Sequence, residues 1–267
     1  MQIQKTKKVH LSKLPQSKLV TIPQDWTVKQ FHEIAEINPE VIGKKYSHKE
    51  ILYVDIGAID DFQINNFKLL SLDSRPSRAQ RIIKKNDIIV STVRPYLKGF
   101  AKIKNDKPNL VCSTGFTVIR AKNKEDSELI FQVVKGKFFE TNIFRQMDGL
   151  AYPAVSSSVV GNSLLAYSKE SKERNKICLI LSNMDKLISS CNDSILITKK
   201  LKQGLIQKIL TKGIGHKKFK RINLGLRSQD ISIPESWDIE ILQKLSDPIT
   251  KGATPTTYGY EWSKSFE

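Results

Sequence analysis

Residues 169–212 read KESKERNKICLILSNMDKLISSCNDSILITKKLKQGLIQKILTK, with one glycine and no proline. Apolar side chains recur along this stretch with a heptad period, and eight of ten successive positions of the seam are apolar. The eight are Ile177, Leu181, Met184, Ile188, Cys191, Ile195, Leu205 and Ile209. Thr198 and Lys202 are the two exceptions. The pattern predicts one long helix, capped by Ser168 and ending before Gly213, which would span on the order of 60 Å at ~1.5 Å per residue. Such a seam is expected to pack against another helix, and the alternative is a helix folded back on its own domain.

A motif that precedes the helix occurs again after it. Residues 22–29 (IPQDWTVK) align without a gap with residues 233–240 (IPESWDIE), at an offset of 211 residues. The match continues at Phe31/Leu242, Ile34/Leu245 and Glu36/Asp247. An offset of this size indicates duplication of a whole module. The second copy reaches Glu267 after about 35 residues, which are too few to bury a core alone, so we expect only the first copy to be a complete domain.

The first copy is expected to be an α+β domain. Helices are predicted at residues 26–35 and 129–145, and strands at 51–59, at 81–93 around a turn at 85–87, and at 109–120 around Gly115. A serine-rich connection is expected at residues 153–161. The predicted organisation is a basic arm (1–20), the α+β domain (21–165), the long helix (166–212), a basic linker (213–231) and the beginning of a second domain (232–267).

The net charge of +17 is concentrated in three stretches. Residues 1–20 carry +5, residues 75–107 carry +8 and residues 194–229 carry +10, which leaves −6 on the other 178 residues. Local basic stripes on a slightly acidic chain are typical of a polyanion partner, because each cation placed on a phosphate releases a counterion. The plainer interpretation of each run is a solvated face. An anionic membrane is disfavoured, since no run combines its charge with a strongly apolar opposite face.

The middle stretch supplies the candidate DNA contacts. They are Arg75, Arg78, Arg81, Lys84, Lys85, Arg94, Lys98 and Lys102. Arginine can bind guanine through two hydrogen bonds, whereas lysine acts mostly as a point charge on phosphate. Arg94 is the strongest single candidate, because a turn at Pro95-Tyr96 would project it, and replacing it with alanine is predicted to abolish specific binding.

The residues point away from catalysis, cofactors and metals. His10, His32, His48 and His216 lack zinc-site spacing. Cys112 has no base placed beside it, and Asp55, Asp60 and Asp61 lack the pattern of a nuclease. No phosphate-binding GxxxxGK loop or adenine-methyltransferase motif occurs. Three cysteines without a CxxC motif, no membrane-length apolar run and no secretory signal favour a cytoplasmic protein.

These features together resemble the specificity subunit of type I restriction-modification systems. The matching segments, in order, are Ile22-Pro23-x-x-Trp26, residues 53–60 (YVDIGAID), residues 78–95 with KKNDIIVSTVRP, residues 113–116 (STGF), and ICLILSNMDKLI followed by LKQGLIQKILT in the long helix. The family usually has Pro-Pro-x-x-Glu-Gln before that helix, where this chain has residues 169–174 (KESKER). The resemblance covers essentially the whole chain.

The resemblance implies a non-catalytic subunit that binds double-stranded DNA. Each target recognition domain of the family reads one half of a split sequence, and two long helices pair into an antiparallel coiled coil that docks methyltransferase and restriction subunits. For this chain it implies one recognition domain and a homodimer through the long helix. Two alternatives remain open: the recognition portion of a fused methyltransferase-nuclease, and a coiled-coil adaptor without DNA affinity.

Overall fold

The computed structural model describes residues 6–10, 19–44, 46–147, 153–223 and 230–246. The chain divides into two compact units, Met1–Leu187 and Ile188–Glu267. The long helix runs through the boundary between them. The predicted opening of a second domain around residues 252–256 lies outside the described residues.

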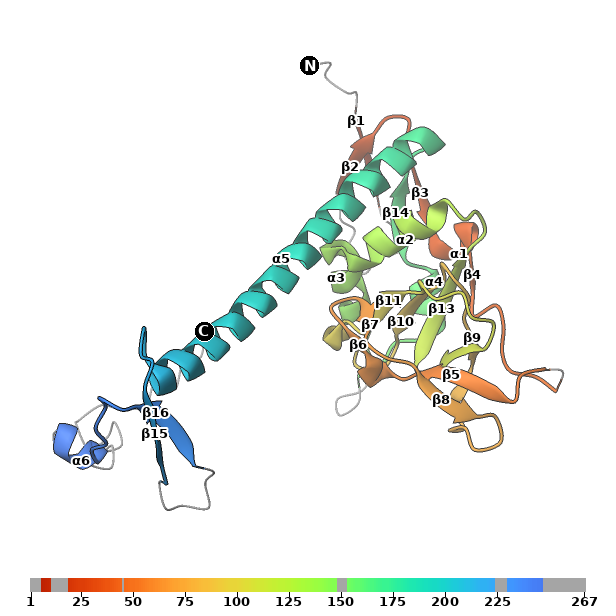
Figure 1. Ribbon diagram of the computed structural model, residues 1–267. Coiled ribbons are helices and arrows are strands. Elements are labelled where there is room, and N and C mark those ends of the chain that lie inside the picture. The colour runs from red at the N-terminus through yellow and green to blue at the C-terminus, as the bar shows by residue number, and fades with distance from the viewer. Residues whose placement is uncertain (1–5, 11–18, 45, 148–152, 224–229, 247–267) are drawn as a thin grey trace, which may run out of the picture. The chain divides into compact units, whose positions relative to one another are not determined.

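The first unit is a mixed helix and strand domain, as predicted (Figure 1). Its strands are β1 (Thr6–His10), β2 (Leu19–Pro23), β3 (Thr27–Gln30), β4 (Ala35–Ile37), β5 (Glu50–Val54), β6 (Ile59–Asp60), β7 (Gln63–Ile64), β8 (Lys68–Ser71), β9 (Ala79–Ile82), β10 (Ile88–Ser91), β11 (Phe100–Lys102), β12 (Leu110–Ser113), β13 (Phe116–Ala121) and β14 (Leu164–Tyr167). Its helices are α1 (Phe31–Ile34), the 3-10 turns η1 (Ile56–Ala58) and η2 (Pro95–Leu97), α2 (Asp126–Lys135), α3 (Lys137–Arg145), α4 (Ser157–Gly161) and the beginning of α5 (Ser171–Lys212).

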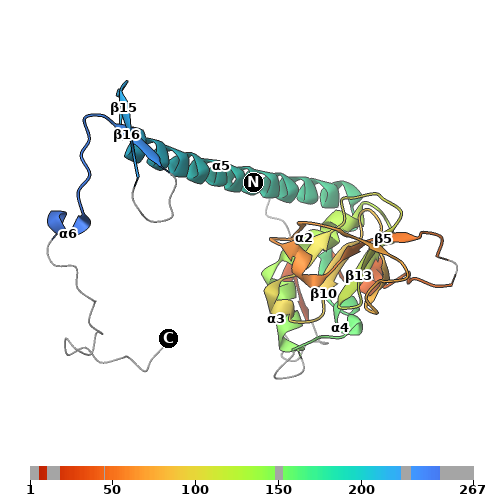
Figure 2. The same ribbon diagram turned by 60° about the horizontal axis from the view of Figure 1, so that its bottom comes forward.

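Two four-stranded sheets and a layer of helices enclose the core of this unit. The strand orders are β8-β5-β12-β9 and β11-β10-β13-β4. Side chains of β10 alternate between two clusters: Ile89 packs with Val54 in the apolar cluster that also contains β12 residues, whereas Ile88 and Val90 pack with Phe139 of α3. Successive residues of a strand point to opposite faces, so β10 is covered by the other sheet on one face and by helices on the other (Figure 2).

Several predicted elements are confirmed. The turn expected at residues 85–87 joins β9 to β10, with Asn86 in a left-handed conformation (φ 74°). The strands expected around Gly115 are β12 and β13. These two strands lie in different sheets rather than forming a hairpin, because β12 pairs with β5 and β9 while β13 pairs with β10 and β4.

Other predicted elements are wrong. The helix expected at 26–35 is replaced by β3, α1 and β4, because residues 27–30 pair along their length with β14. The helix expected at 129–145 is two helices broken at Gly136, whose backbone is extended. The serine-rich segment contains α4, capped by the Ser156 side chain, and the Ser157 hydroxyl is hydrogen-bonded to Asn38 and Thr117. It is therefore a packed part of the domain and not a linker.

The long helix α5 covers Ser171–Lys212, within the segment 166–212 that was expected to contain it. Its first turns pack on the domain through one face, on which Arg174 and Cys178 are buried. Further along this face, Ser182 donates a hydrogen bond to Glu128 (2.7 Å) and Asp185 accepts one from Gln132 (2.8 Å). The predicted seam is a different face. Within the first unit, the seam residue Met184 is 53% exposed.

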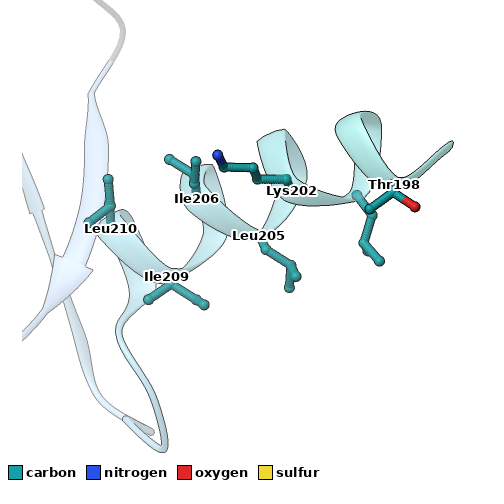
Figure 3. A pocket seen from close by; sticks show the side chains of 7 residues that line it. Thr198, Lys202, Leu205, Ile206, Ile209 and Leu210 are labelled. Carbon is teal, nitrogen blue, oxygen red and sulfur yellow. The ribbon is translucent and has the colours of Figure 1, made fainter. Parts of the chain in front are cut away.

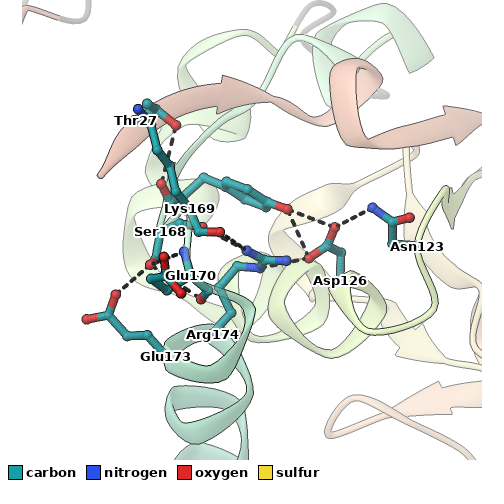
Figure 4. A network of polar contacts seen from close by, with 9 residues as sticks. Thr27, Asn123, Asp126, Ser168, Lys169, Glu170, Glu173 and Arg174 are labelled. Carbon is teal, nitrogen blue, oxygen red and sulfur yellow. Dashed lines mark hydrogen bonds and ion pairs between the residues drawn. The ribbon is translucent and has the colours of Figure 1, made fainter. Parts of the chain in front are cut away.

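A polar network fixes the beginning of α5 to the domain (Figure 4). The guanidinium of Arg174 donates to the carboxylate of Asp126 at 3.0 Å and to the backbone carbonyl of Ser168 at 2.9 Å. The hydroxyl of Tyr167 donates to the same carboxylate at 3.1 Å. Asp126 is completely buried, and burying a carboxylate is tolerable only when it is paired and hydrogen-bonded. This network therefore sets the position of the helix from inside the domain.

The duplication begins earlier than the sequence motif suggested. β1 pairs with β2 in the first unit, and β15 (Phe219–Ile222) pairs with β16 (Ile231–Pro234) in the second, which also contains α6 (Leu242–Leu245). The registers are equivalent, with Lys7 opposite Ile22 and Lys220 opposite Ile233. The repeated unit is thus a hairpin with one basic strand. The predicted basic arm and basic linker each contain that strand.

Candidate nucleic-acid interface

The fold divides the basic stretch 75–107 between two ends of the sheets. β9 begins directly after Arg78, and the chain returns through β10 toward Arg94, so Arg78 and Arg94 lie at the same end of the sheets. Lys84 and Lys85 are in the turn between β9 and β10 and lie at the opposite end. We call the first the Arg94 end (Ile56, Arg78, residues 92–99, Thr114 and Gly115). The second is the Lys84 end (residues 84–87 and 102–107). The eight candidate residues therefore do not form one patch.

Backbone hydrogen bonds assemble the Arg94 end from separate loops. The Thr92 amide donates to the carbonyl of Gly115 (2.8 Å), and the Thr114 amide donates to the carbonyl of Arg78 (2.8 Å). Gly115 is packed so closely against Ile56 that a Cβ would lie 2.9 Å from Cδ1 of that side chain. Arg78, Arg94 and Lys98 are all exposed. The fold thus brings three cations from two loops to one rigid edge.

At the Lys84 end the cations are paired with carboxylates. Lys84 and Arg120 both bind Glu40, and Arg120 also forms a hydrogen-bonded ion pair with the buried Asp87 at 2.7 Å. Two further pairs join Lys85 to Asp106 at 3.4 Å and Lys102 to Glu128 at 2.7 Å. These contacts neutralise much of the positive charge at this end.

Arg75 and Arg81 make structural contacts with the backbone. The guanidinium of Arg75 donates to the carbonyls of Leu72 (2.7 Å) and Ala79 (3.3 Å). The guanidinium of Arg81 donates to the carbonyl of Phe116, and burial lowers the pKa of Arg81. Both side chains are half-buried. Of the eight candidates, Arg78, Arg94 and Lys98 are the three that are exposed at the Arg94 end.

One carboxylate approaches the Arg94 end. Glu140 of α3 lies 3.2 Å from the ammonium group of Lys98 and 3.1 Å from that of Lys137. The hydrogen bond from Lys137 and the contact with Lys98 outweigh desolvation and hold the pKa of Glu140 below its ordinary value. This ionised carboxylate is shared by two lysines, so the group as a whole keeps a positive charge. No local pattern in the sequence predicts this contact, because Lys98 and Glu140 are 42 positions apart.

The environment of Cys112 is unsuited to nucleophilic chemistry. The side chain is completely buried in the cluster between the two sheets. Burial raises the pKa of its thiol, because the thiolate would lose its hydration. Only the thiolate is a strong nucleophile. Within the described residues, moreover, His, Cys, Asp and Glu side chains form no group of three that could hold a metal ion.

We predict that acid will destabilise the Lys84 end. The hydrogen bond from Lys84 lowers the pKa of Glu40 below its usual 4.5. Partial burial opposes this effect by disfavouring the charged form, and Arg120 adds to it. A carboxylate with a depressed folded pKa contributes stability above its unfolded pKa, and this contribution is lost as the pH falls through the folded pKa. The free energy of unfolding, measured by urea titration, should decline below pH 4.5, and Glu40→Gln should make the decline shallower. Glu36→Gln, on the exposed face of β4, should leave it unchanged. An equal slope in all three proteins would contradict the assignment.

None of the helices in the described part of the chain has the length and hydropathy needed to cross a bilayer.

No protein-family model matches the chain. Over 252 residues, 90% of the chain, it is 28% identical to a Methanocaldococcus jannaschii protein named as the type I restriction enzyme MjaX specificity subunit, of which it spans 57%. A second protein of that organism, the type I restriction enzyme MjaVIII specificity subunit, is 30% identical over 51% of the chain and 31% of its own length.

Solved structures give the same result. The HsdS subunit from Thermoanaerobacter tengcongensis matches with a TM-score of 0.57 and 28% identity, over 76% of this chain and 55% of that one. A chain from a study of complex assembly and conformational transition of the type I R-M system matches with a TM-score of 0.59 and 27% identity, over the same shares of the two chains. The chain thus spans about half the length of these relatives, and by sequence and fold it is similar to the specificity subunits of type I restriction-modification systems.

Proposed function

We propose that this chain is a DNA-recognition subunit that reads one half of a split sequence with its first unit and performs no catalysis itself. The observation that carries the proposal is the Arg94 end, where the fold gathers Arg78, Arg94 and Lys98 on a rigid edge. A lysine or arginine on such an edge can neutralise phosphate or, for arginine, bind guanine through two hydrogen bonds. The relatedness to specificity subunits supports the same function.

Selection from a random-sequence duplex pool tests this proposal. The purified chain should enrich a short sequence, and its affinity for that sequence should fall steeply with salt, because phosphate contacts release counterions. In a host that carries the cognate methyltransferase, deletion of the gene should remove methylation at sites that contain the enriched half. Failure to bind any duplex at low salt would contradict DNA recognition and favour an adaptor that binds only proteins.

We further propose that α5 pairs with a second copy of itself. Its C-terminal turns carry an open apolar surface formed by Leu201, Leu205, Ile206, Ile209 and Leu210, with Thr198 and Lys202 at its border (Figure 3). A single exposed helix face of this kind is stable in water only when another surface covers it. The specificity subunits that this chain resembles are expected to have paired long helices. This similarity favours another helix as the partner of α5.

An antiparallel pair suits the charges and the surface of the first unit. Residues 194–212 hold five lysines and no acid, so a parallel pair would place ten lysines together. In an antiparallel pair they would lie along residues 171–193, where four basic residues are set against Glu173, Asp185 and Asp193 and the net charge is only +1. At that half, Ile177 and Leu181 line an apolar groove of about 430 Å³ together with Trp26 and Phe138. The groove extends the seam and would receive the last turns of the second helix.

We predict that two seam substitutions will abolish the dimer. Wild-type chain should scatter light with twice the 30.4 kDa mass of one chain, and Leu205→Asp with Ile209→Asp should reduce it to one chain, because two buried carboxylates would be left without partners. Gln203→Asp with Gln207→Asp adds the same charge at the same spacing on another exposed part of the helix, and should remain dimeric. A wild-type protein that is monomeric with and without DNA would contradict the pairing.

Docking of methyltransferase and restriction subunits is proposed for the same helices. A structure of a type I complex is among the fold matches, which supports assembly but does not identify contact residues. Co-purification of the chain with a type I methyltransferase subunit of its host provides the test. If the Leu205→Asp, Ile209→Asp protein no longer co-purified while the Gln203→Asp, Gln207→Asp control still did, docking would depend on the paired helices. Retention in both would place the docking surface elsewhere.

A further inference from the structure

The turn between β10 and β11 has an unusual backbone. Arg94 and Lys98, the residues on either side of η2, both adopt left-handed conformations, with φ of 48° and 54°. Residues other than glycine, asparagine and aspartate rarely adopt this conformation, since Cβ then crowds the backbone. Two such residues within five positions mark a turn whose shape is imposed by its surroundings.

Hydrogen bonds and close packing at the base of the turn hold this shape. The Arg94 amide donates to the carbonyl of Pro153 (2.9 Å), and the Lys98 amide donates to the carbonyl of Pro95 (2.9 Å). Pro95 is buried. Gly99 follows at a position where a Cβ would lie only 3.2 Å from that of Ser91. The base of the turn is therefore fixed, and only its tip is available to a ligand.

The tip combines apolar exposure with positive charge. Leu97 is 61% exposed and Tyr96 is 44% exposed, and they lie between the cations Arg94 and Lys98. Proteins that bend DNA insert an apolar side chain between base pairs, while neighbouring cations neutralise phosphates. A protein partner would also cover an apolar tip, but the flanking cations and Arg78 on the adjacent loop favour a polyanion.

We propose that Leu97 inserts between two stacked base pairs of the recognised DNA, with Arg94 and Lys98 on the phosphates beside the step. This inference rests on the proposed DNA recognition. It gives the turn a role in deforming DNA, so that part of the sequence preference comes from the ease with which a base step unstacks rather than from contacts to base edges.

Duplexes that carry 2-aminopurine at successive positions of the selected sequence test the insertion. The fluorescence of this base rises when it is unstacked. The wild-type chain should raise it at one step and should shorten the distance between donor and acceptor dyes on the two DNA ends. Leu97→Ala should abolish both changes and weaken binding roughly tenfold. Leu97→Phe should retain them.

Leu69→Ala is the matched control, because Leu69 of β8 is an equally exposed leucine (60%) outside the turn. It should bind and unstack DNA as the wild type does. Specific binding by the wild type without any fluorescence change would overturn the insertion and leave DNA recognition intact. No binding by the wild type would overturn DNA recognition itself. If Leu97→Ala left DNA binding and unstacking unchanged but abolished co-purification with the methyltransferase, the turn would be a protein-docking surface, and the insertion would be wrong.

Discussion

Replacing Arg78 with alanine and Arg94 with asparagine is expected to weaken specific DNA binding by about 10- to 100-fold near physiological salt. Both side chains are exposed at the Arg94 end. Asparagine is chosen at position 94 because it tolerates the left-handed backbone found there (φ 48°). If both arginines contact phosphate, the slope of log affinity against log salt should become shallower by about 1.8, which is ~0.9 for each contact. Fluorescence anisotropy over a salt series measures both quantities.

The control removes the same charge from the other end of the sheets. Lys84→Ala with Lys85→Ala also loses two cations from the basic stretch, but these cations are paired with Glu40 and Asp106. We expect less than a threefold change in affinity and a nearly unchanged salt slope. Equal losses in the two double variants would mean that net charge, rather than the Arg94 end, governs binding. A larger loss in the lysine variant would place the interface at the Lys84 end.

Replacing Arg174 with alanine is expected to lower the free energy of unfolding by about 3 to 5 kcal/mol. The substitution leaves the carboxylate of Asp126 in the domain interior, where Arg174 is its charged partner at 3.0 Å. It also removes the donor to the carbonyl of Ser168, and the cation over the ring of Tyr167 at 4.4 Å. Urea denaturation of the whole chain, followed by circular dichroism, measures the loss.

Two further variants separate the buried pair from a general effect of charge. Lys85→Ala breaks an exposed pair with Asp106 and should cost about 0 to 1 kcal/mol. Adding Asp126→Asn to Arg174→Ala should recover part of the lost stability, since the uncompensated charge is then removed. A cost below about 1 kcal/mol for Arg174→Ala would show that water or neighbouring groups solvate Asp126 well enough without the guanidinium.

Local patterns in the sequence were sufficient for elements whose structure is determined nearby. The turn at Asn86 and the strands on either side of Gly115 follow from turn residues between β-branched runs, and α5 follows from a heptad without proline. The segment 26–35 shows the opposite case. Its apolar spacing fits a helix, but pairing with β14, more than 130 positions away, makes residues 27–30 a strand. Tertiary pairing overrides a weak local preference.

The candidate site shows the same limit. Composition identifies the basic stretch as a candidate, but charge counted along the chain contains no information on which edge of a sheet a residue occupies. The edge that each residue occupies depends on β10, which crosses the interior between Asp87 and Thr92. Likewise, the partners that neutralise Lys84 and Lys102, namely Glu40 and Glu128, come from other elements. The exposed tip at Leu97 carried no sequence signal, because an isolated leucine is most often a core residue.

The equivalent hairpins β1–β2 and β15–β16 define where recognition domains can be exchanged by engineering. In each, the strand that carries Ile-Pro is paired with a basic strand that precedes it. A chimera joined at Ile231, where β16 begins, would combine one strand of the hairpin from one parent with the other strand from another. A junction at Gly213, directly after α5, keeps both strands with the domain they precede. Libraries built on the second junction would exchange each hairpin together with the sequence that follows it, and each new pairing would provide a new candidate specificity.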